Sequence, residues 1–212
     1  MNILVGNSRG AGLRELIPKS TLQISSYIPG AKVSNLGNLA LKLHSNSNSP
    51  DNTHVYFIAG ITDLTKKLKG QNYEEVIFTE DINLAVARVS NTLSLTKSRL
   101  SKLKVKAIFC TINTMHIEKW NLARKQQSKT TYLQYTNQYD QMQINLNKAI
   151  DMLNSKIIEL NKQDSHHTPL LHQTIKHPKG HGKYFYKYNL LVDGVHGNQT
   201  AKKNGPKASI KP

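Results

Sequence analysis

Short apolar runs recur along the chain at intervals that suit the strands of a sheet. They predict β-strands over residues 2–5, 21–28, 55–59 and 105–112. Several of the intervening segments repeat apolar residues at helical spacing. Strands separated by helices predict a parallel sheet with helices on both faces. We therefore expect an α/β fold of the flavodoxin-like kind, a three-layer α/β/α sandwich with a mostly parallel sheet of about five strands, the fifth over residues 166–173.

Helical spacing is clearest in three segments. The first covers residues 33–43, and the second covers residues 81–103, with Asp81 as its cap and an apolar side formed by Leu84, Ala87, Leu95 and Leu103. The third, over residues 132–162, carries a stripe formed by Met142, Leu146, Ala149, Leu153, Ile157 and Leu160. This stripe indicates packing against a core, because it lacks the sustained flanking charge pairs of a coiled coil.

Three other segments are less regular. Residues 113–131 are polar, with Trp120 as their one large anchor, and residues 173–187 are expected to form a basic loop rich in His and Tyr. A short helix is expected over residues 13–17, because Pro18 ends or bends it.

A glycine or a polar residue stands shortly after each of four apolar runs. These residues are Ser8, Gly30, Thr62 and His196. The carboxyl ends of parallel strands meet at one edge of a sheet, and ligands of such folds bind there. The four residues are therefore expected to converge on one site.

The turn after the first strand, Gly6-Asn7-Ser8, leads through further glycines into a helical pattern. A sharp turn of this kind exposes the Ser8 hydroxyl beside unpaired backbone N–H groups, which suits an acyl-transfer nucleophile. The plain alternative is a glycine-rich turn with an N-capping serine. Far along the chain, Asp193 and His196 stand three residues apart, so that the carboxylate can orient the imidazole as a base.

Together these segments resemble the SGNH (GDSL-type) hydrolases, block by block and over nearly the full chain. The Gly-Asp-Ser block of that family appears as Gly6-Asn7-Ser8, and the Asp-x-x-His block is intact from Asp193 to His196. In its sequence segments, the chain is most similar to SGNH-like esterase domains of animal mobile elements and related viruses.

Two further blocks are recognisable with changes. Gly30 resembles the oxyanion-binding glycine of the second block, and Gly37 is the alternative, although it lies inside a helical pattern. The Gly-x-Asn-Asp block appears as Gly60-Ile61-Thr62-Asp63, in which Thr62 replaces the asparagine. The asparagine amide is the side-chain oxyanion donor of the family, and loss of one such donor typically costs ~10²–10³ in turnover.

The resemblance implies a serine esterase or deacylase that needs no cofactor and acts on an acyl ester. Ser8 would attack the carbonyl, His196 would take and return the proton, and Asp193 would orient His196. The backbone N–H groups of Ser8 and Gly30, with Thr62, would stabilise the oxyanion. Gly60 and Asp63 belong to the same oxyanion and substrate region.

The charge of the chain brings in a second interpretation. The formal net charge is +16, with 11 Lys and Arg against 7 Asp and Glu in residues 1–100, and 18 against 6 in residues 101–212. Such an excess favours polyanionic partners, either nucleic acid or an anionic membrane surface. An SGNH-like domain of a germ-plasm protein lacks the triad and binds RNA through a basic surface. The alternative function is therefore a catalytically weak or silent SGNH-like module that binds RNA or DNA through its basic C-terminal half.

Within that half, one strand alternates tyrosine with lysine. Lys183, Tyr184, Tyr186 and Lys187 could offer aromatic rings for base stacking beside contacts to phosphate. A β-ribbon with half-buried tyrosines is the favoured interpretation, since alternating aromatic residues are ordinary in strands.

Metal binding and disulfide formation are not expected. The nearby histidines lack cysteines and match no common zinc spacing; they are His166, His167, His172, His177 and His181. The single Cys110 forbids an internal disulfide and sits in an apolar run, which predicts an inert core thiol.

Domain limits and cellular location follow from the remaining composition. Residues 1–200 are expected to form one domain, and residues 201–212 a basic, disordered tail. The sequence shows no signal peptide and no transmembrane run, so an intracellular location is expected, cytoplasmic or nuclear. The sequence does not determine the oligomeric state.

Overall fold

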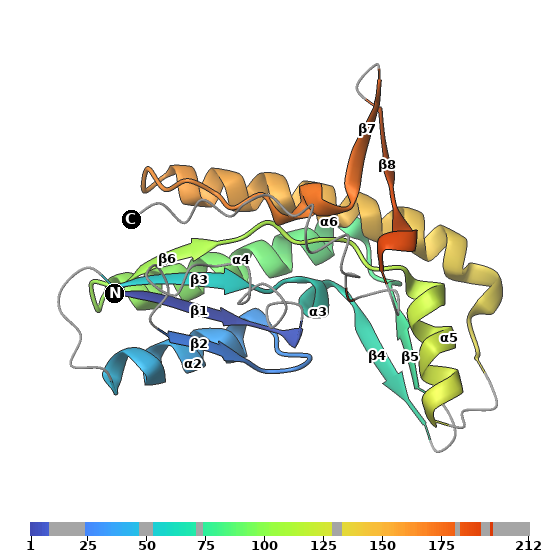
Figure 1. Ribbon diagram of the computed structural model, residues 1–212, viewed down its shortest axis with the longest axis horizontal. Helices are drawn as coiled ribbons and strands as arrows, with labels where there is room; N and C mark the ends of the chain where they lie inside the picture. The colour runs from blue at the N-terminus through green and yellow to red at the C-terminus, as the bar shows by residue number, and fades with distance from the viewer. Residues whose placement is uncertain are drawn as a thin grey trace.

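Four parallel strands form the central sheet (Figure 1). They are β1 (Asn2–Gly6), β2 (Ile24–Tyr27), β3 (His54–Ile58) and β6 (Lys106–Phe109), in the order β2-β1-β3-β6. The computed structural model describes residues 1–8, 24–46, 53–70, 74–128, 133–180, 183–191 and 196. The expected helix over residues 13–17 and the expected tail over residues 201–212 lie outside them. The parallel α/β sheet that the sequence predicted is confirmed.

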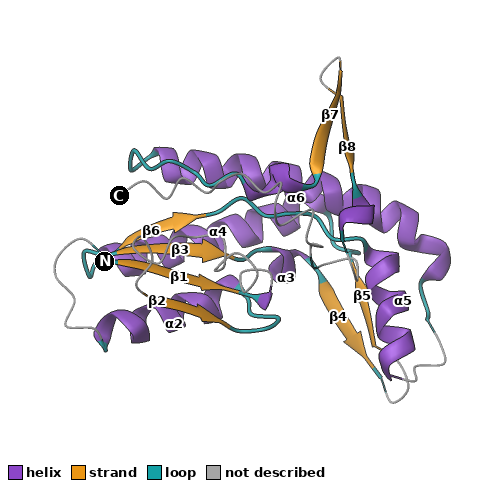
Figure 2. Ribbon diagram, viewed as in Figure 1, coloured by secondary structure: helices purple, strands orange, loops and turns teal. Residues whose placement is uncertain are grey.

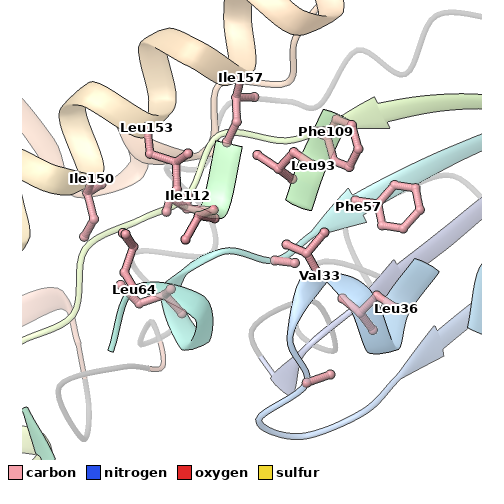
Figure 3. Packing of buried hydrophobic residues seen from close by; sticks show 14 of the residues in the cluster. Val33, Leu36, Phe57, Leu64, Leu93, Phe109, Ile112, Ile150, Leu153 and Ile157 are labelled. Atoms are coloured by element: carbon pink, nitrogen blue, oxygen red, sulfur yellow. The ribbon is translucent and has the colours of Figure 1, made fainter. Parts of the chain in front are cut away.

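Three helices cover one face of this sheet (Figures 1 and 2). They are α2 (Val33–Ser45), α4 (Ile82–Ser101) and α6 (Tyr139–Lys162). Alternate strand residues such as Ile3, Val5 and Phe57 point to this side and are buried in the main core, because side chains alternate between the two faces of a strand (Figure 3). The stripe predicted for α6 is confirmed as core packing, since five of its six residues are buried: Met142, Leu146, Ala149, Leu153 and Ile157.

The opposite face of the sheet has its own apolar cluster. It contains Leu4, Tyr56, Ile58, Ile108, Cys110 and Leu171. Burial raises the pKa of the Cys110 thiol to about 12, so the thiol stays protonated at neutral pH. The prediction of a core cysteine is confirmed.

Helix α4 begins where the sequence predicted, but its buried face was predicted wrongly. The Asp81 side chain accepts hydrogen bonds from the N–H groups of Asn83 and Leu84, as an N-cap does. Leu84, Leu95 and Leu103, expected to face the core, are 65%, 57% and 47% exposed. The buried residues of the helix are instead Ala85, Val86, Val89, Leu93, Thr96 and Leu100. This stripe combines the small or β-branched residues Ala85, Val86, Val89 and Thr96 with two leucines, and it lets α4 pack between α2 and α6.

Residues 66–69, 74–77 and 117–128 form a lobe that the sequence did not predict. An antiparallel hairpin of β4 (Lys66–Lys69) and β5 (Glu74–Ile77) extends from the sheet, with α5 (Ile117–Ser128) along one side (Figure 1). We call β4, β5 and α5 the hairpin lobe. The segment that contains α5 was expected to be irregular, since it carries little helical amphipathicity of its own.

Buried polar groups fasten the hairpin lobe. The Asn121 side chain of α5 accepts from the Val76 N–H at 2.8 Å and donates to the Val76 carbonyl at 3.0 Å. The Glu75 carboxylate is fully buried, and it accepts bonds from the Gln134 and Tyr135 N–H groups and from the Tyr139 hydroxyl. These bonds satisfy groups whose burial would otherwise be costly.

The fifth strand expected over residues 166–173 is not formed. That segment contains a 3₁₀ turn, η3 (Leu171–Thr174). It meets the chain after β6 at Thr111, whose N–H donates to the Pro169 carbonyl at 3.0 Å and whose hydroxyl oxygen accepts from the His172 N–H at 3.2 Å. Proline has no N–H to donate to a ladder, which accounts for the difference. The Asn161 amide of α6 occupies the next position on this edge, bonding the N–H and carbonyl of Phe109 at 3.1 and 2.8 Å.

The prediction of a basic loop is also wrong for the segment over residues 173–187. It forms a hairpin of β7 (Lys176–Gly180) and β8 (Lys183–Tyr186) that projects from the body beside α6 (Figure 1). Two short 3₁₀ turns, η2 (Thr136–Gln138) and η4 (Tyr188–Leu190), complete the described elements. Across the described part of the chain, no helix has both the length and the apolar character needed to cross a bilayer.

Replacing Asn154 tests how much these asparagine contacts stabilise the fold. Its amide bonds the N–H and the carbonyl of Ile112 at 2.8 and 2.9 Å. Each buried main-chain group left without a partner costs about 1–3 kcal/mol, so Asn154→Ala is expected to lower the free energy of unfolding by about 2–5 kcal/mol. Urea unfolding measures the change. Asn145→Ala on the same helix, where Asn145 accepts from Gln141 near the surface, serves as the control and is expected to change stability by less than about 1 kcal/mol.

Candidate functional site

The turn after β1 brings Ser8 to the carboxyl edge of the sheet. The Asn7 N–H donates to the Ile58 carbonyl of β3 at 3.1 Å, and the buried Asn7 side chain fixes this turn in the protein. Ser8 follows in the first turn of helical backbone and is partly exposed. The serine therefore lies at a strand end with access to solvent.

The turn after β2 places Gly30 at the same edge. The Ile28 N–H donates to the Gly6 carbonyl at 2.9 Å, and the Ala31 N–H donates to the Ile28 carbonyl at 3.1 Å, which closes a tight turn through Pro29. Gly30 has a φ of 68°, in the left-handed region that favours glycine at the third position of such a turn.

The alternative glycine, Gly37, has a different environment. It is buried in α2, and a Cβ atom on it would lie 3.0 Å from Cγ2 of Thr96 on α4. Gly37 therefore serves close packing of two helices.

After β3, the chain turns sharply at Gly60 into the short helix α3 (Ile61–Leu64). Gly60 has a φ of 122°, and a Cβ on it would lie 3.2 Å from Cγ2 of Ile112. This close approach turns the chain so that Thr62, which is partly exposed, stands at the strand end. Gly60 itself is not among the residues that line the cavity described below.

Asp63 ties the third strand end to the second. Its two carboxylate oxygens lie 3.3 and 3.1 Å from the N–H of Val33, the first residue of α2. Burial raises the pKa of Asp63, while the Val33 N–H and the cations Lys32 and Arg88 oppose that shift. The Arg88 guanidinium also donates to the Asp63 carbonyl at 2.9 Å. Asp63 therefore holds α3 against the loop that carries Gly30.

One cavity of about 940 Å³ opens at this edge of the sheet. Five predicted site residues line it: Ser8, Gly30, Thr62, Asp63 and His196. Ser8 and His196 come from opposite ends of the chain, and the strand ends bring Gly30 and Thr62 beside them. Asp193 lies outside the described residues.

Residues of the hairpin lobe and residues near it also line the cavity. The apolar residues of this lining are Ile61, Leu64, Val76, Ile77, Met115 and Trp120. Its basic residues are Lys32, Lys66, Lys67, Arg88 and Arg124. The lobe residues were missed because their positions depend on pairing between β5 and α5, and the only local signal was the lone Trp120 in a polar segment.

Of the residues predicted for nucleic-acid contact, Tyr186 ends β8 and Lys187 follows it, and neither is among the described residues that line the cavity. The Tyr186 hydroxyl bonds Asp151 at 3.1 Å, and its ring stacks on Tyr188 with centroids 5.8 Å apart. Lys187 lies over the Phe185 ring, which is 41% exposed. Lys183 and Tyr184 belong to β8. The favoured prediction of a β-ribbon with half-buried tyrosine is confirmed for Tyr186.

The histidines that could have suggested a metal site are dispersed. Within the described ranges, no three His, Cys, Asp or Glu side chains gather as a metal site requires. His166 packs edge-on against His54, His172 contacts the Thr111 hydroxyl at 2.9 Å, and His177 lies beside the Phe185 ring.

Several solved structures of GDSL-type proteins share this fold. A GDSL-like lipase from Bacteroides thetaiotaomicron matches with a TM-score of 0.56 at 13% sequence identity, over 96% of this chain and 82% of that chain. A member of the lipolytic G-D-S-L family from Veillonella parvula matches with a TM-score of 0.57 at 12% identity, over 99% of this chain and 95% of that chain. No family model and no curated protein matches the sequence. At these identities the similarity shows the fold, and it confirms the SGNH-type fold that the sequence blocks implied; the likeness to mobile-element domains stays a prediction.

Asp63 offers a test of how the edge is held together. Asp63→Ala leaves the buried Val33 N–H without its acceptor, so the free energy of unfolding is expected to fall by about 1–3 kcal/mol. Asp63→Asn keeps a carbonyl oxygen at this place and is expected to lose less. Urea unfolding of both variants measures the effect, with Asp140→Ala, at an exposed position in the first turn of α6, as the control. Equal stability of Asp63→Ala and wild type would contradict a positioning role.

Proposed function

We propose that this chain is a serine esterase or deacylase of the SGNH type, with Ser8 as the nucleophile, His196 as the base and Asp193 as the residue that orients His196. The observation that carries the proposal is that Ser8 and His196 line one cavity together with Gly30 and Thr62. A nucleophile, a base and oxyanion donors around one space are the parts that acyl transfer requires.

The proposed reaction has two steps. The Ser8 hydroxyl oxygen attacks the ester carbonyl while His196 accepts its proton, and the backbone N–H groups of Ser8 and Gly30 stabilise the oxyanion with the Thr62 hydroxyl. His196 then returns the proton to the departing alcohol. A water molecule, deprotonated by His196, hydrolyses the acyl-enzyme and regenerates Ser8.

The surroundings of the proposed site favour this chemistry. Gly30 is held in its turn, and Asp63 fixes α3 to the start of α2 next to it, so the proposed donors are positioned before substrate arrives. Preorganised donors need little rearrangement as charge develops, and this accounts for much of their catalytic effect. Asp63 is a positioning residue in this scheme.

The alternative function is binding of RNA or DNA without catalysis. Two observations favour it: the charge excess in residues 101–212, and the exposed Phe185 ring beside Lys187 on a projecting hairpin. Tyr186 is occupied with Asp151 and Tyr188, which leaves fewer rings for base stacking than the sequence suggested. The two functions are compatible, because Phe185, Tyr186 and Lys187 are not among the described residues that line the cavity.

A fluorophosphonate probe tests the nucleophile. Wild type is expected to be labelled at one serine and to hydrolyse a short 4-nitrophenyl ester. Ser8→Ala and His196→Ala are expected to lose at least about 10³-fold in kcat/KM, because the nucleophile and its base act as one unit. Ser155→Ala, at an exposed serine of α6, is the matched control and should behave as wild type. Equal labelling of wild type and Ser8→Ala, or of neither, rules out the esterase proposal.

Thr62 offers a gain-of-function test. An asparagine amide reaches further than the threonine hydroxyl, so Thr62→Asn is expected to raise kcat by roughly tenfold, part of the ~10²–10³ that one oxyanion donor supplies. KM is expected to change little, because the interaction strengthens in the transition state. Thr62→Val should lower kcat. If steady-state kinetics show that neither variant alters kcat, Thr62 does not face the oxyanion.

A further inference from the structure

The charged side chains around the cavity are unevenly distributed between the two signs. Among the described residues, five cations line it, Lys32, Lys66, Lys67, Arg88 and Arg124, against two carboxylates, Asp63 and Glu80. A cavity lined mainly by one sign of charge raises the local concentration of ligands of the opposite sign. What matters for a ligand is how many of these charges are already neutralised.

Both carboxylates of the lining are occupied. Glu80 and Arg88 form a two-point ion pair, with nitrogen-to-oxygen distances of 3.2 and 2.6 Å, and the Arg88 guanidinium lowers the pKa of Glu80. The Asp63 carboxylate faces the Val33 N–H. Glu80 therefore offsets the charge of Arg88, and the Asp63 carboxylate interacts electrostatically with both Lys32 and Arg88.

The three remaining lysines of the lining differ in whether a carboxylate pairs with them. Lys67 pairs with Glu74 at 2.9 Å, outside the lining. Lys32 and Lys66 form no ion pair with a carboxylate in the described part of the chain, and both are exposed. Lys66 comes from β4 and Lys32 from the start of α2, so these charges flank the cavity from two elements.

Arg124 adds a cation held against an aromatic ring. Its guanidinium lies 5.1 Å from the centroid of the Trp120 ring, and both side chains line the cavity. Stacking on a largely buried indole restricts a side chain that would otherwise sample many rotamers. A guanidinium restrained in this way suits contact with a carboxylate or phosphate.

We infer that the substrate is a small ester that carries an anionic group, a carboxylate or a phosphate, in addition to the ester bond. The inference rests on the proposed esterase function and names the substrate class of that site. Lys66 and Arg124 of the hairpin lobe, with Lys32, bind the anionic group. The apolar wall formed by Ile61, Leu64, Val76, Ile77 and Met115 accepts the carbon chain. A cavity of about 940 Å³ is large enough for a ligand of that kind.

Trp120 allows binding to be measured without turnover, because it is the single tryptophan of the chain. The Ser8→Ala protein is titrated with monomethyl glutarate and with methyl valerate, which has a methyl group in place of the carboxylate. We expect the anionic ester to change Trp120 fluorescence at concentrations about tenfold lower, a preference that shrinks in about 0.5 M NaCl. Butyl phosphate in the same titration separates phosphate from carboxylate as the preferred anion.

Charge reversal tests which cations act. Lys66→Glu and the double variant Lys66→Glu/Arg124→Glu are expected to remove the preference for the anionic ester. The matched control is Lys69→Glu/Lys125→Glu, which changes net charge equally on the same strand and helix at exposed positions outside the cavity lining. It should keep the preference, so a general effect of net charge is excluded. The single variant keeps the test usable if loss of the Trp120 stacking partner impairs folding.

Kinetics separate this inference from the esterase proposal. With wild type, the ratio of kcat/KM for 4-nitrophenyl glutarate over 4-nitrophenyl valerate is expected to be about ten, mostly through KM. Hydrolysis of both esters at equal rates, with equal binding in the titration, overturns the anionic substrate while the esterase stands. Absence of hydrolysis with a retained binding preference overturns the esterase and keeps the anion site. If an RNA oligonucleotide alters Trp120 fluorescence and neither the carboxylate nor the phosphate ligand does, the inference of a small anionic substrate is wrong.

Discussion

Three buried asparagine amides bind main-chain groups that the small sheet leaves without partners. Asn154 and Asn161 of α6 each bond both the N–H and the carbonyl of one residue, at Ile112 and Phe109. Asn121 of α5 does the same at Val76. A carboxamide carries one donor and one acceptor side by side, as a peptide group does, so it can stand in for a neighbouring strand. Without it, β6 would present a buried edge with unpaired groups, which is costly.

These contacts extend from α6 to the cavity through a short series of neighbours. Asn154 holds Ile112, and Ile112 lies against Gly60, which leaves room for it by having no side chain. Gly60 sets the direction of α3, and Asp63 of α3 holds the start of α2. The rigidity of the cavity edge therefore comes from core packing and buried hydrogen bonds, and the exposed turns at Ser8 and Gly30 need little support of their own.

The sequence was informative where a local pattern has one physical solution. Apolar runs followed by Ser8, Gly30 and Thr62 predicted strand ends, and parallel strands bring their ends to one edge. Helix α4 shows the limit of such reasoning. Leu84 and Leu95 are larger apolar residues than Ala85 and Val89, yet the smaller residues are buried, because α2 and α6 both pack closely against this helix. The neighbours of a helix decide which of two possible stripes is buried.

The hairpin lobe was beyond local reasoning for a similar cause. Helix α5 is polar on most of its surface and is held by Asn121 and Trp120 against β5, a strand distant in the chain. Glu75 would be an exposed residue by its type, and its burial depends on N–H groups at Gln134 and Tyr135. Such pairings are visible only once the chain is folded. Polar residues that look like surface residues in the sequence hold this lobe in place.

Separate contacts hold the strand ends and the hairpin lobe, so the two parts of the cavity can change independently. The groups proposed for chemistry follow the strand ends, which the core fixes, whereas Lys66, Trp120 and Arg124 belong to the lobe, which is fastened by separate contacts at Val76 and Glu75. Substitutions in the lobe can change which ligand is bound without moving Ser8 or Gly30. The converse also holds, because a change at Thr62 alters the proposed oxyanion contacts while the lobe cations stay in place. In the proposed scheme, the lobe cations contribute to substrate preference and the residues at the strand ends carry the chemistry.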